Sequence, residues 1–390
     1  HMELSLINPA WPACVILGYR LGHGSAVRPP PIDPCDLAEA PLKTQQRQLG
    51  RSALHLAMWA VLAGAVHAEG TYHFTDLGAV GSFSIGYAIN RHGSVAGFSS
   101  GKTWSATLWH HGGIDALGEP SPEVGNCQAH SINGEGAVVG ECLGDDSYSR
   151  AVLWEGGVAT VLPTLGGLYG HASAINQAGR IVGHSSVAQL GMAHATLWID
   201  GTPTDLGTLP GGAYSEAHAI NDKGQVVGYS TNRQGLSRAT VWRGTKVIDL
   251  GTLGGLSSQA RALNGRGQVV GCSQTAQGQL RATLWNDKTA TDLGTLPGGL
   301  TSCAHGINDA GVAVGYGFVT KAAKYLDRRA TMWNGGATID LNTLLDDETR
   351  AAGWLLLAAT AINDHGVITG VATNSIAHDT RAFLLTPPAP

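Results

Sequence analysis

Six polar side chains that could bind a ligand or transfer a proton stand at fixed distances before a repeated turn. The turn begins with Asn, and the residues three and five positions before it vary while the rest of the repeat is nearly uniform. The members able to bind polar groups are His130, His171, Glu216, His218, Arg261 and His305. Imidazole, carboxylate and guanidinium groups that converge on one place are typical of a ligand site. We therefore predict ligand binding here, with hydrogen bonding between neighbouring repeats as the alternative explanation.

Other motifs that resemble catalytic or metal sites are better explained by the repeat itself. Residues 183–186 resemble the start of a hydrolase nucleophile elbow, but Val187 occupies the position of the motif's final Gly. The same Gly-x-Ser occurs at Ser99 and Ser230, which indicates a structural serine. Asn-Asp-x-Gly at three of the turns lacks the acidic ligands of a calcium loop, and HExxH, CxxC and P-loop motifs are absent. We predict no catalytic residue, no metal ligand and no cofactor.

The composition favours a β-protein rich in turns and argues against nucleic acid as a partner. The 390 residues include 55 Gly, and only 14% are charged. Glycine that recurs at fixed places indicates tight turns rather than disorder. A net charge of −5 provides no basic stripe to neutralise phosphates.

Seven copies of one turn set the period of the chain. The turn residues are Asn90, Asn133, Asn176, Asn221, Asn264, Asn308 and Asn363, and a Gly follows each of them by three positions. Asn at the start and Gly at the end suit a type I turn followed by a residue with positive φ, which Gly adopts without steric cost. Each copy therefore begins with a predicted β-hairpin.

Each copy contains four predicted strands. In the best copy these are residues 215–221, 225–230, 238–242 and 246–250. The third strand ends in Trp in six of the seven copies, which we interpret as packing between neighbouring repeats. Four short strands in about 43 residues are typical of one β-propeller blade.

The ends of the repeat region decide between a ring and an open array. The copy that begins at Asn363 lacks a fourth strand, and residues 72–77 resemble the missing one. We predict an all-β, seven-bladed propeller of four-stranded blades within a single domain, residues 69–390, closed by residues 72–77 in the last blade. An open solenoid is the alternative, but it would require polar capping repeats that the sequence does not contain. Residues 341–357 replace the usual connection and are predicted to hold a short helix.

The residues before the repeats are predicted to be absent from the mature protein. Residues 1–50 show no repeat and are interpreted as a disordered or wrongly assigned upstream segment. Residues 51–68 combine an apolar run with Val-His-Ala, a small-residue cleavage pattern, so cleavage would leave Glu69 first. A single membrane helix is the alternative, but the run is shorter than the roughly 20 residues that a span needs. We predict export to the periplasm or the extracellular space, with no stable membrane span.

In an oxidising compartment the cysteines can form disulfides. Cys127 and Cys142 flank the Asn133 turn symmetrically. A bulge near Gly136 would put them on opposite faces, so the bridge stays open at this point. Cys272 and Cys303 are expected to be buried thiols.

The repeats resemble a known family. Leu-Gly-Thr-Leu-Pro-Gly-Gly, Ala-Ile-Asn-x-x-Gly-x-Val-Val-Gly and Arg-Ala-Thr-Leu-Trp, as in residues 206–242, are similar to the HAF-type extracellular repeat. Residues 381–383 (Arg-Ala-Phe) and 194–196 (His-Ala-Thr) match its name-giving triplet loosely. The resemblance covers residues 72–387 and implies a bacterial exported protein of undetermined molecular role. It supplies no catalytic residues.

Three functional hypotheses arise from the sequence. The first is a secreted, monomeric binding scaffold for a glycan or a protein. The second is a propeller hydrolase or lyase that acts on an extracellular polymer through His130, His218, His305 and Glu216, which would require a raised pKa of Glu216. The third is a purely structural surface array, which would have no cleft.

Overall fold

The computed structural model describes residues 71–101, 103–111, 113–188 and 192–388, all within the unit Glu69–Pro390. The segments 1–50 and 51–68, predicted to be an upstream region and a signal peptide, lie outside the described residues. Of the described helices, none has both the length and the apolar character that a bilayer span requires.

The described chain is all-β and consists of antiparallel four-stranded groups that follow one another in sequence. Five groups are separate sheets with the strand order of the sequence. They are β6 (Val124–Ile132), β7 (Val138–Gly144), β8 (Ser149–Glu155) and β9 (Val158–Val161); β10 (Gly166–Ile175), β11 (Ile181–Val187), β12 (Ala193–Ile199) and β13 (Thr202–Asp205); β14 (Ser215–Ile220), β15 (Val226–Thr231), β16 (Ser237–Arg243) and β17 (Lys246–Asp249); β18 (Gly254–Leu263), β19 (Val269–Thr275), β20 (Leu280–Asn286) and β21 (Thr289–Gly294); and β22 (Ser302–Ile307), β23 (Ala313–Phe318), β24 (Arg328–Asn334) and β25 (Ala337–Asp340).

The two ends of the repeat region share an eight-stranded sheet. One half contains β2 (Phe83–Ile89), β3 (Val95–Ser100), β4 (Trp104–His110) and β5 (Gly113–Ala116), and the other contains β26 (Trp354–Ile362), β27 (Ile368–Asn374), β28 (Asp379–Thr386) and β1 (His73–Asp76). The halves meet at one parallel pair, Phe83 and Thr380. The segment predicted at residues 72–77 is β1, and it pairs with β28 from His73 opposite Thr386 to Asp76 opposite Phe383.

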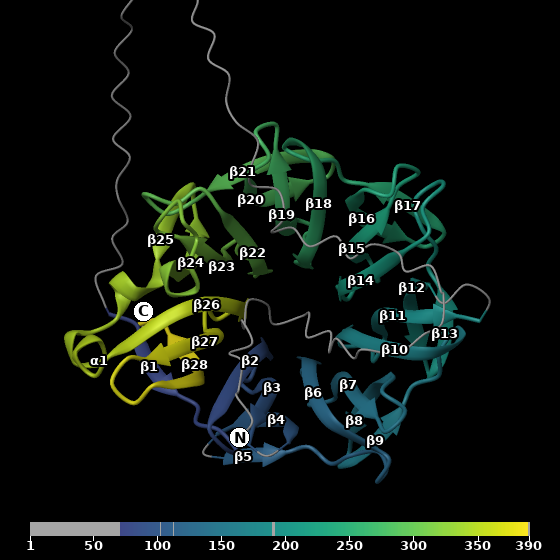
Figure 1. Cartoon of the computed structure of the whole chain (residues 1–390), viewed down its shortest axis with the longest axis horizontal. Helices are drawn as coiled ribbons and strands as arrows, with labels where there is room; N and C mark the ends of the chain where they lie inside the picture. The colour runs from purple at the N-terminus through teal and green to yellow at the C-terminus, as the bar shows by residue number, and fades with distance from the viewer. Residues whose placement is uncertain (1–70, 102, 112, 189–191, 389–390) are drawn as a thin grey trace, which may run out of the picture. The chain divides into compact units, whose positions relative to one another are not determined.

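The sheets stand around a common centre, with the first strand of each group innermost (Figure 1). This is the arrangement of a β-propeller. The predicted short helix within residues 341–357 is present as a 3-10 turn η2 (Leu341–Leu344) followed by α1 (Asp347–Ala351), and η1 (Tyr325–Asp327) lies in the loop before β24.

The turn Asn residues link each sheet to the next. In the turn of Asn264, the side-chain Oδ1 accepts hydrogen bonds from the backbone N–H groups of Arg266 and Gln268, and Gly267 takes φ +83°. The side-chain Nδ2 of Asn264 donates to the backbone carbonyl of Asn308 at 3.0 Å. The same inter-sheet bond runs from Asn90 to Asn133, Asn133 to Asn176, Asn176 to Asn221, Asn221 to Asn264, Asn308 to Asn363, and Asn363 to Asn90.

The third-strand Trp residues form the hydrophobic contacts between sheets, as predicted. Trp285 of β20 packs with Val227 and Leu250 of the preceding sheet, and Trp109 of β4 packs with Ala382 of β28. The Trp residues of the other sheets lie in equivalent clusters. Four of the six side chains are fully buried, which is where burial of a large ring stabilises most.

Every first strand carries a β-bulge three residues before its turn Asn. In β6 the register shifts between Ala129 and Ser131, so His130 is the extra residue. Next to the bulge, a Cβ on Gly140 would lie 1.9 Å from the carbonyl oxygen of Gln128. The second strand of every copy has a Gly at this place, four positions after the turn Gly, and the first-strand backbone requires it. The bulge changes the direction of the side chain that it carries.

Candidate functional site

The sequence-variable residues of each repeat occupy three positions that the fold brings together. Two are the first-strand residues five and three positions before the turn Asn, and the third is the residue after the second-strand Gly. The first and third are cross-strand partners, as in the pairs Gln128–Glu141, His171–His184 and Glu216–Tyr229. We call these three the variable positions. Cross-strand partners point to one face, so each sheet presents a small cluster of them.

Aromatic rings at the variable positions form a continuous stack across three neighbouring sheets. Tyr87 stacks on His130 at 5.2 Å between ring centroids, and His130 lies 4.5 Å from His171. His171 in turn stacks on His184 at 5.2 Å with an interplanar angle of 7°. The hydroxyl of Tyr87 donates to Gln128 Oε1 at 3.2 Å.

Glu141 is the carboxylate of this stack. Burial would raise its pKa, but the neighbouring His171 and His130 and the hydroxyl of Ser149, which donates to Oε2, hold the pKa well below its usual range. Burial lowers the pKa of His171 to about 3. The pair is thus an ionised carboxylate beside a neutral imidazole at pH 7.

Glu216 forms a second carboxylate centre. The hydroxyl of Tyr214 donates to Oε1, and His218 Nε2 lies 3.4 Å from Oε2. Burial would raise the pKa of Glu216, but His184, His218 and the Tyr214 bond lower it well below its usual range. The other ring nitrogen of His218, Nδ1, lies 2.7 Å from the carbonyl oxygen of Ala260. The side chains of Glu216 and His218 keep 20% and 13% of their surface exposed, so their edges reach solvent.

A cationic group lies on the next two sheets. Arg261 donates to Gln259 Oε1 at 2.8 Å. Arg328 is only 6% exposed, with its guanidinium 5.2 Å from the Tyr316 ring centroid and 5.3 Å from that of Tyr325. Burial, together with the charges of Arg261, Arg328 and His218, lowers the pKa of His305 to about 3. The polar side chains around the centre thus run from the carboxylates of Glu141 and Glu216 to the guanidinium groups of Arg261 and Arg328.

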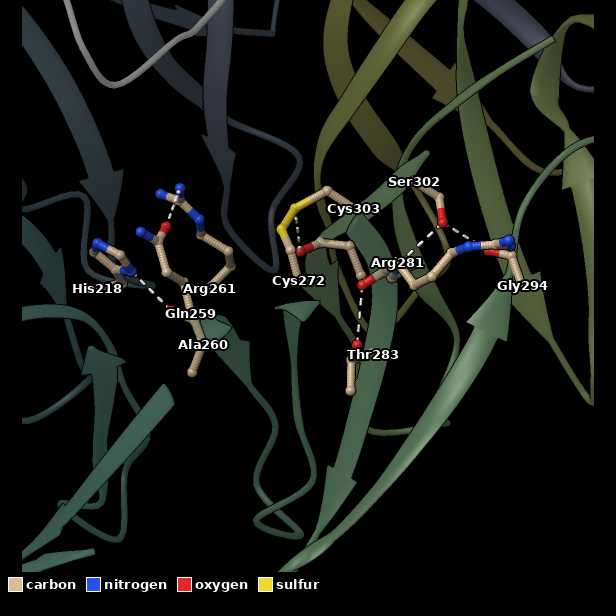
Figure 2. The surroundings of a disulfide bond; sticks show 12 residues. His218, Gln259, Ala260, Arg261, Cys272, Arg281, Thr283, Gly294, Ser302 and Cys303 are labelled. Carbon is tan, nitrogen blue, oxygen red and sulfur yellow. Dashed lines mark hydrogen bonds between the residues drawn. A yellow bond between two sulfur atoms is a disulfide. The ribbon is translucent and has the colours of Figure 1, made fainter. Parts of the chain in front are cut away.

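Both cysteine pairs of the repeat region are disulfides. Cys127 is joined to Cys142, and Cys272 is joined to Cys303, with Cα–Cα distances of 4.0 and 4.9 Å. The second bond links β19 to β22 of the following sheet, close to Arg261 and its Gln259 partner (Figure 2). The expectation that Cys272 and Cys303 are two separate thiols was wrong, because the adjacent sheets bring these residues of successive repeats together.

A cleft of about 390 Å³ lies away from these residues, between the two halves of the eight-stranded sheet. Its lining includes Arg91, His92, His110, His365 and Thr386. It contains none of the six predicted ligand-binding residues. These side chains belong to exposed turns and strand ends, where His110 is held by its contact with Asp115 at 2.7 Å.

The structure places the six predicted ligand residues in three groups rather than one. His130 and His171 belong to the ring stack, Glu216 and His218 to the second carboxylate centre, and the last two, Arg261 and His305, to the cationic group. Sequence reasoning missed Glu141, His184, Tyr229 and Arg328. For the first three, the signal was variation after the second-strand Gly.

No protein-family model and no curated protein matches the chain. Solved structures similar to it include a gluconolactonase from Xanthomonas campestris, at 11% identity and a TM-score of 0.37 over 81% of this chain and 90% of that one. The SapL1 lectin, solved with α-methyl fucoside, is 15% identical with a TM-score of 0.39 over 70% and 99%. The six-bladed Aleuria aurantia lectin is 10% identical with a TM-score of 0.37 over 81% and 99%. TM-scores this low carry no argument about what this chain binds.

Proposed function

We propose that this chain is a secreted or periplasmic binding scaffold of the HAF-repeat type, which presents the variable positions of a closed seven-bladed propeller to a glycan or a protein. The observation that carries the proposal is the gathering of polar side chains at the variable positions, in a chain whose other repeat positions are uniform. A scaffold that only builds a ring has no need for polar variety at one place.

Two features support ring closure and the count of seven. The Asn inter-sheet bonds run in one direction and return from Asn363 to Asn90. The pairing of β1 with β28 supplies the fourth strand of the last group. With β1 paired to it, β28 is not left as the outer edge of the last group, and covering such an edge protects a β-protein from edge-to-edge association.

The chemistry of the variable positions suits a polyhydroxylated or peptide ligand. Tyr and His rings offer flat apolar faces, while Glu216 and Arg261 offer an acceptor and donors for hydrogen bonds. Two disulfides are consistent with an oxidising compartment, which supports export.

The alternative, a hydrolase or lyase, is less well supported. A glycosidase-type acid needs a carboxyl group whose pKa is raised towards neutrality. The pKa of Glu216 is instead lowered by its hydrogen bonds and His neighbours. Glu216 therefore acts as an acceptor or a fixed charge, and not as a proton donor at pH 7.

The test is a ligand screen of the full chain against glycan and peptide libraries by thermal shift, followed by calorimetry. A ligand of the variable positions should bind the Glu216→Gln and His218→Ala variants at least about tenfold more weakly, which is about 1.4 kcal/mol. The control is His365→Ala, which alters the outer cleft. A ligand that binds Glu216→Gln and His218→Ala as tightly as the wild type refutes binding at the variable positions. A screen that finds no ligand refutes the role as a binding scaffold.

A further inference from the structure

Three side chains from two neighbouring sheets point one ligand atom each at a common place. They are His130 of β6, Glu141 of β7 and His171 of β10. Nε2 of His130 lies 3.8 Å from Glu141 Oε1, and Nε2 of His171 lies 3.9 Å from the same oxygen. All three atoms lie within 4.8 Å of one another.

These contacts, at 3.8 and 3.9 Å, are too long for hydrogen bonds. Within the part of the chain that the structure describes, His130 Nε2 is buried and has no hydrogen-bond partner. A buried polar atom without a partner costs about 1–3 kcal/mol, so its position requires an explanation. Both imidazoles are held by ring stacking against Tyr87 and His184, which limits their freedom to turn elsewhere.

The opposite side of two of the three ligands, Glu141 and His171, is fixed by a hydroxyl group. Ser149 donates to Glu141 Oε2, which leaves Oε1 for the two imidazoles. His171 Nδ1 pairs with Ser173 Oγ at 3.2 Å, which leaves Nε2 for the centre. Outer partners of this kind orient histidine and carboxylate ligands in metal sites.

We propose that His130, Glu141 and His171 bind a divalent cation of the zinc class, with a fourth position left for water or a bound ligand. Bond lengths of about 2.0–2.2 Å at a tetrahedral centre place ligand atoms about 3.4 Å apart. The nitrogen–oxygen distances are within about half an ångström of that value, a change that small side-chain rotations provide. Two nitrogen ligands and one oxygen favour Zn²⁺ and its neighbours over Ca²⁺ or Mg²⁺, which prefer oxygen.

The site belongs to one pair of repeats. Glu141 is the only acid after the second-strand Gly in the seven copies. The three ligands lie on different strands, with 41 positions between His130 and His171, so no short sequence motif contains them all. This inference goes beyond the proposed binding role and does not depend on it, because metal uptake is measured without any glycan or peptide.

The experiment is titration of the chelator-treated full chain with ZnCl₂ by calorimetry, with CoCl₂ added in parallel to report tetrahedral coordination by visible absorption. We expect one tight site per chain, lost in Glu141→Gln and His130→Ala. Ser149→Ala should weaken it about 10–100-fold, as expected for an outer partner. The matched control is His305→Gln, which changes the same strand position in another sheet.

Each variant is checked for folding by circular dichroism and melting without metal. If His130→Ala does not fold, Glu141→Gln, which keeps the side-chain volume, decides together with the Co²⁺ spectrum of the wild type. Unchanged zinc affinity in Glu141→Gln overturns the proposal. So does a site that Ca²⁺ or Mg²⁺ fills as well as Zn²⁺.

Discussion

Replacing one turn Asn should destabilise the protein more than the same change in an outer turn. Asn264 is 4% exposed and makes four side-chain hydrogen bonds: it accepts from Arg266 N–H and Gln268 N–H, and donates to Gln268 Oε1 and the Asn308 carbonyl. At about 1 kcal/mol per bond, Asn264→Ala should cost about 3–4 kcal/mol, because the N–H groups and the buried carbonyl lose their partner.

The outer turn of Asn232 provides the matched control. Its Oδ1 accepts from the N–H groups of Gln234 and Leu236, as the turn Asn residues do, but the bonds that the structure assigns to its side chain all stay within that turn. The turn is partly exposed, so water replaces the lost bonds. Asn232→Ala should therefore cost about 1 kcal/mol. The difference between the variants reports the two Nδ2 bonds of Asn264, one to Gln268 Oε1 and one across the sheets to Asn308, together with the burial around them.

The assay is thermal unfolding by calorimetry. An unfolding entropy of about 2.1 cal/mol/K per residue over roughly 320 residues makes 1 kcal/mol worth about 1.5 °C. The expected drop in Tm is about 4–6 °C for Asn264→Ala and about 1–2 °C for Asn232→Ala. Equal drops would refute the view that the turn Asn residues hold neighbouring sheets together.

Three further predictions concern pH, redox state and export. The folded pKa of His305 is about 3 and its unfolded pKa about 6.5, so the unfolded chain takes up a proton first and the free energy of unfolding decreases as pH falls from 6.5 towards 3. In urea denaturation, the free energy of unfolding of His305→Gln should decrease by up to about 1.4 kcal/mol per pH unit less than that of the wild type, and equal slopes would contradict this. Replacing Cys272 and Cys303 together by Ala should lower the free energy of unfolding by about 4 kcal/mol from loop entropy over a separation of 31 residues, and a thiol reductant should shift the Tm of the wild type more than that of this variant. The exported protein should begin at Glu69 by mass spectrometry, and an intact upstream segment in the exported fraction would exclude the predicted cleavage.

Repetition explains why much of the fold could be predicted. A turn signal read once is weak, but Asn and Gly recurring at one spacing locate a hairpin in each copy. The third strands predicted at residues 106–109, 150–154, 194–198, 238–242, 281–285, 329–333 and 381–385 lie within β4, β8, β12, β16, β20, β24 and β28, and their Trp residues pack between sheets.

The candidate site was only partly predictable because it depends on contacts between sheets. The bulge at His130 sets which second-strand residue faces Gln128, and a strand pattern does not reveal a bulge. The same bulge lies at His130 rather than near Gly136, so Cys127 faces Cys142 and the disulfide forms. Glu141 meets His130 and Ser149 of its own repeat, but its second imidazole, His171, comes from the neighbouring sheet, and no motif within one repeat reveals that contact.

The bulge before each turn separates what shapes the protein from what the protein can recognise. The bulge leaves no room for a Cβ on the second-strand Gly, so that residue is fixed. The bulged residue itself is Tyr, His, Ser, Arg or Thr in different copies, and the register is the same in each. Substitutions there are therefore tolerated by the scaffold, as loop substitutions are in an antibody. New binding specificities can therefore be built at these strand positions without changing the register of the strands, provided that side chains in contact across neighbouring sheets, such as His130 and His171, are changed together.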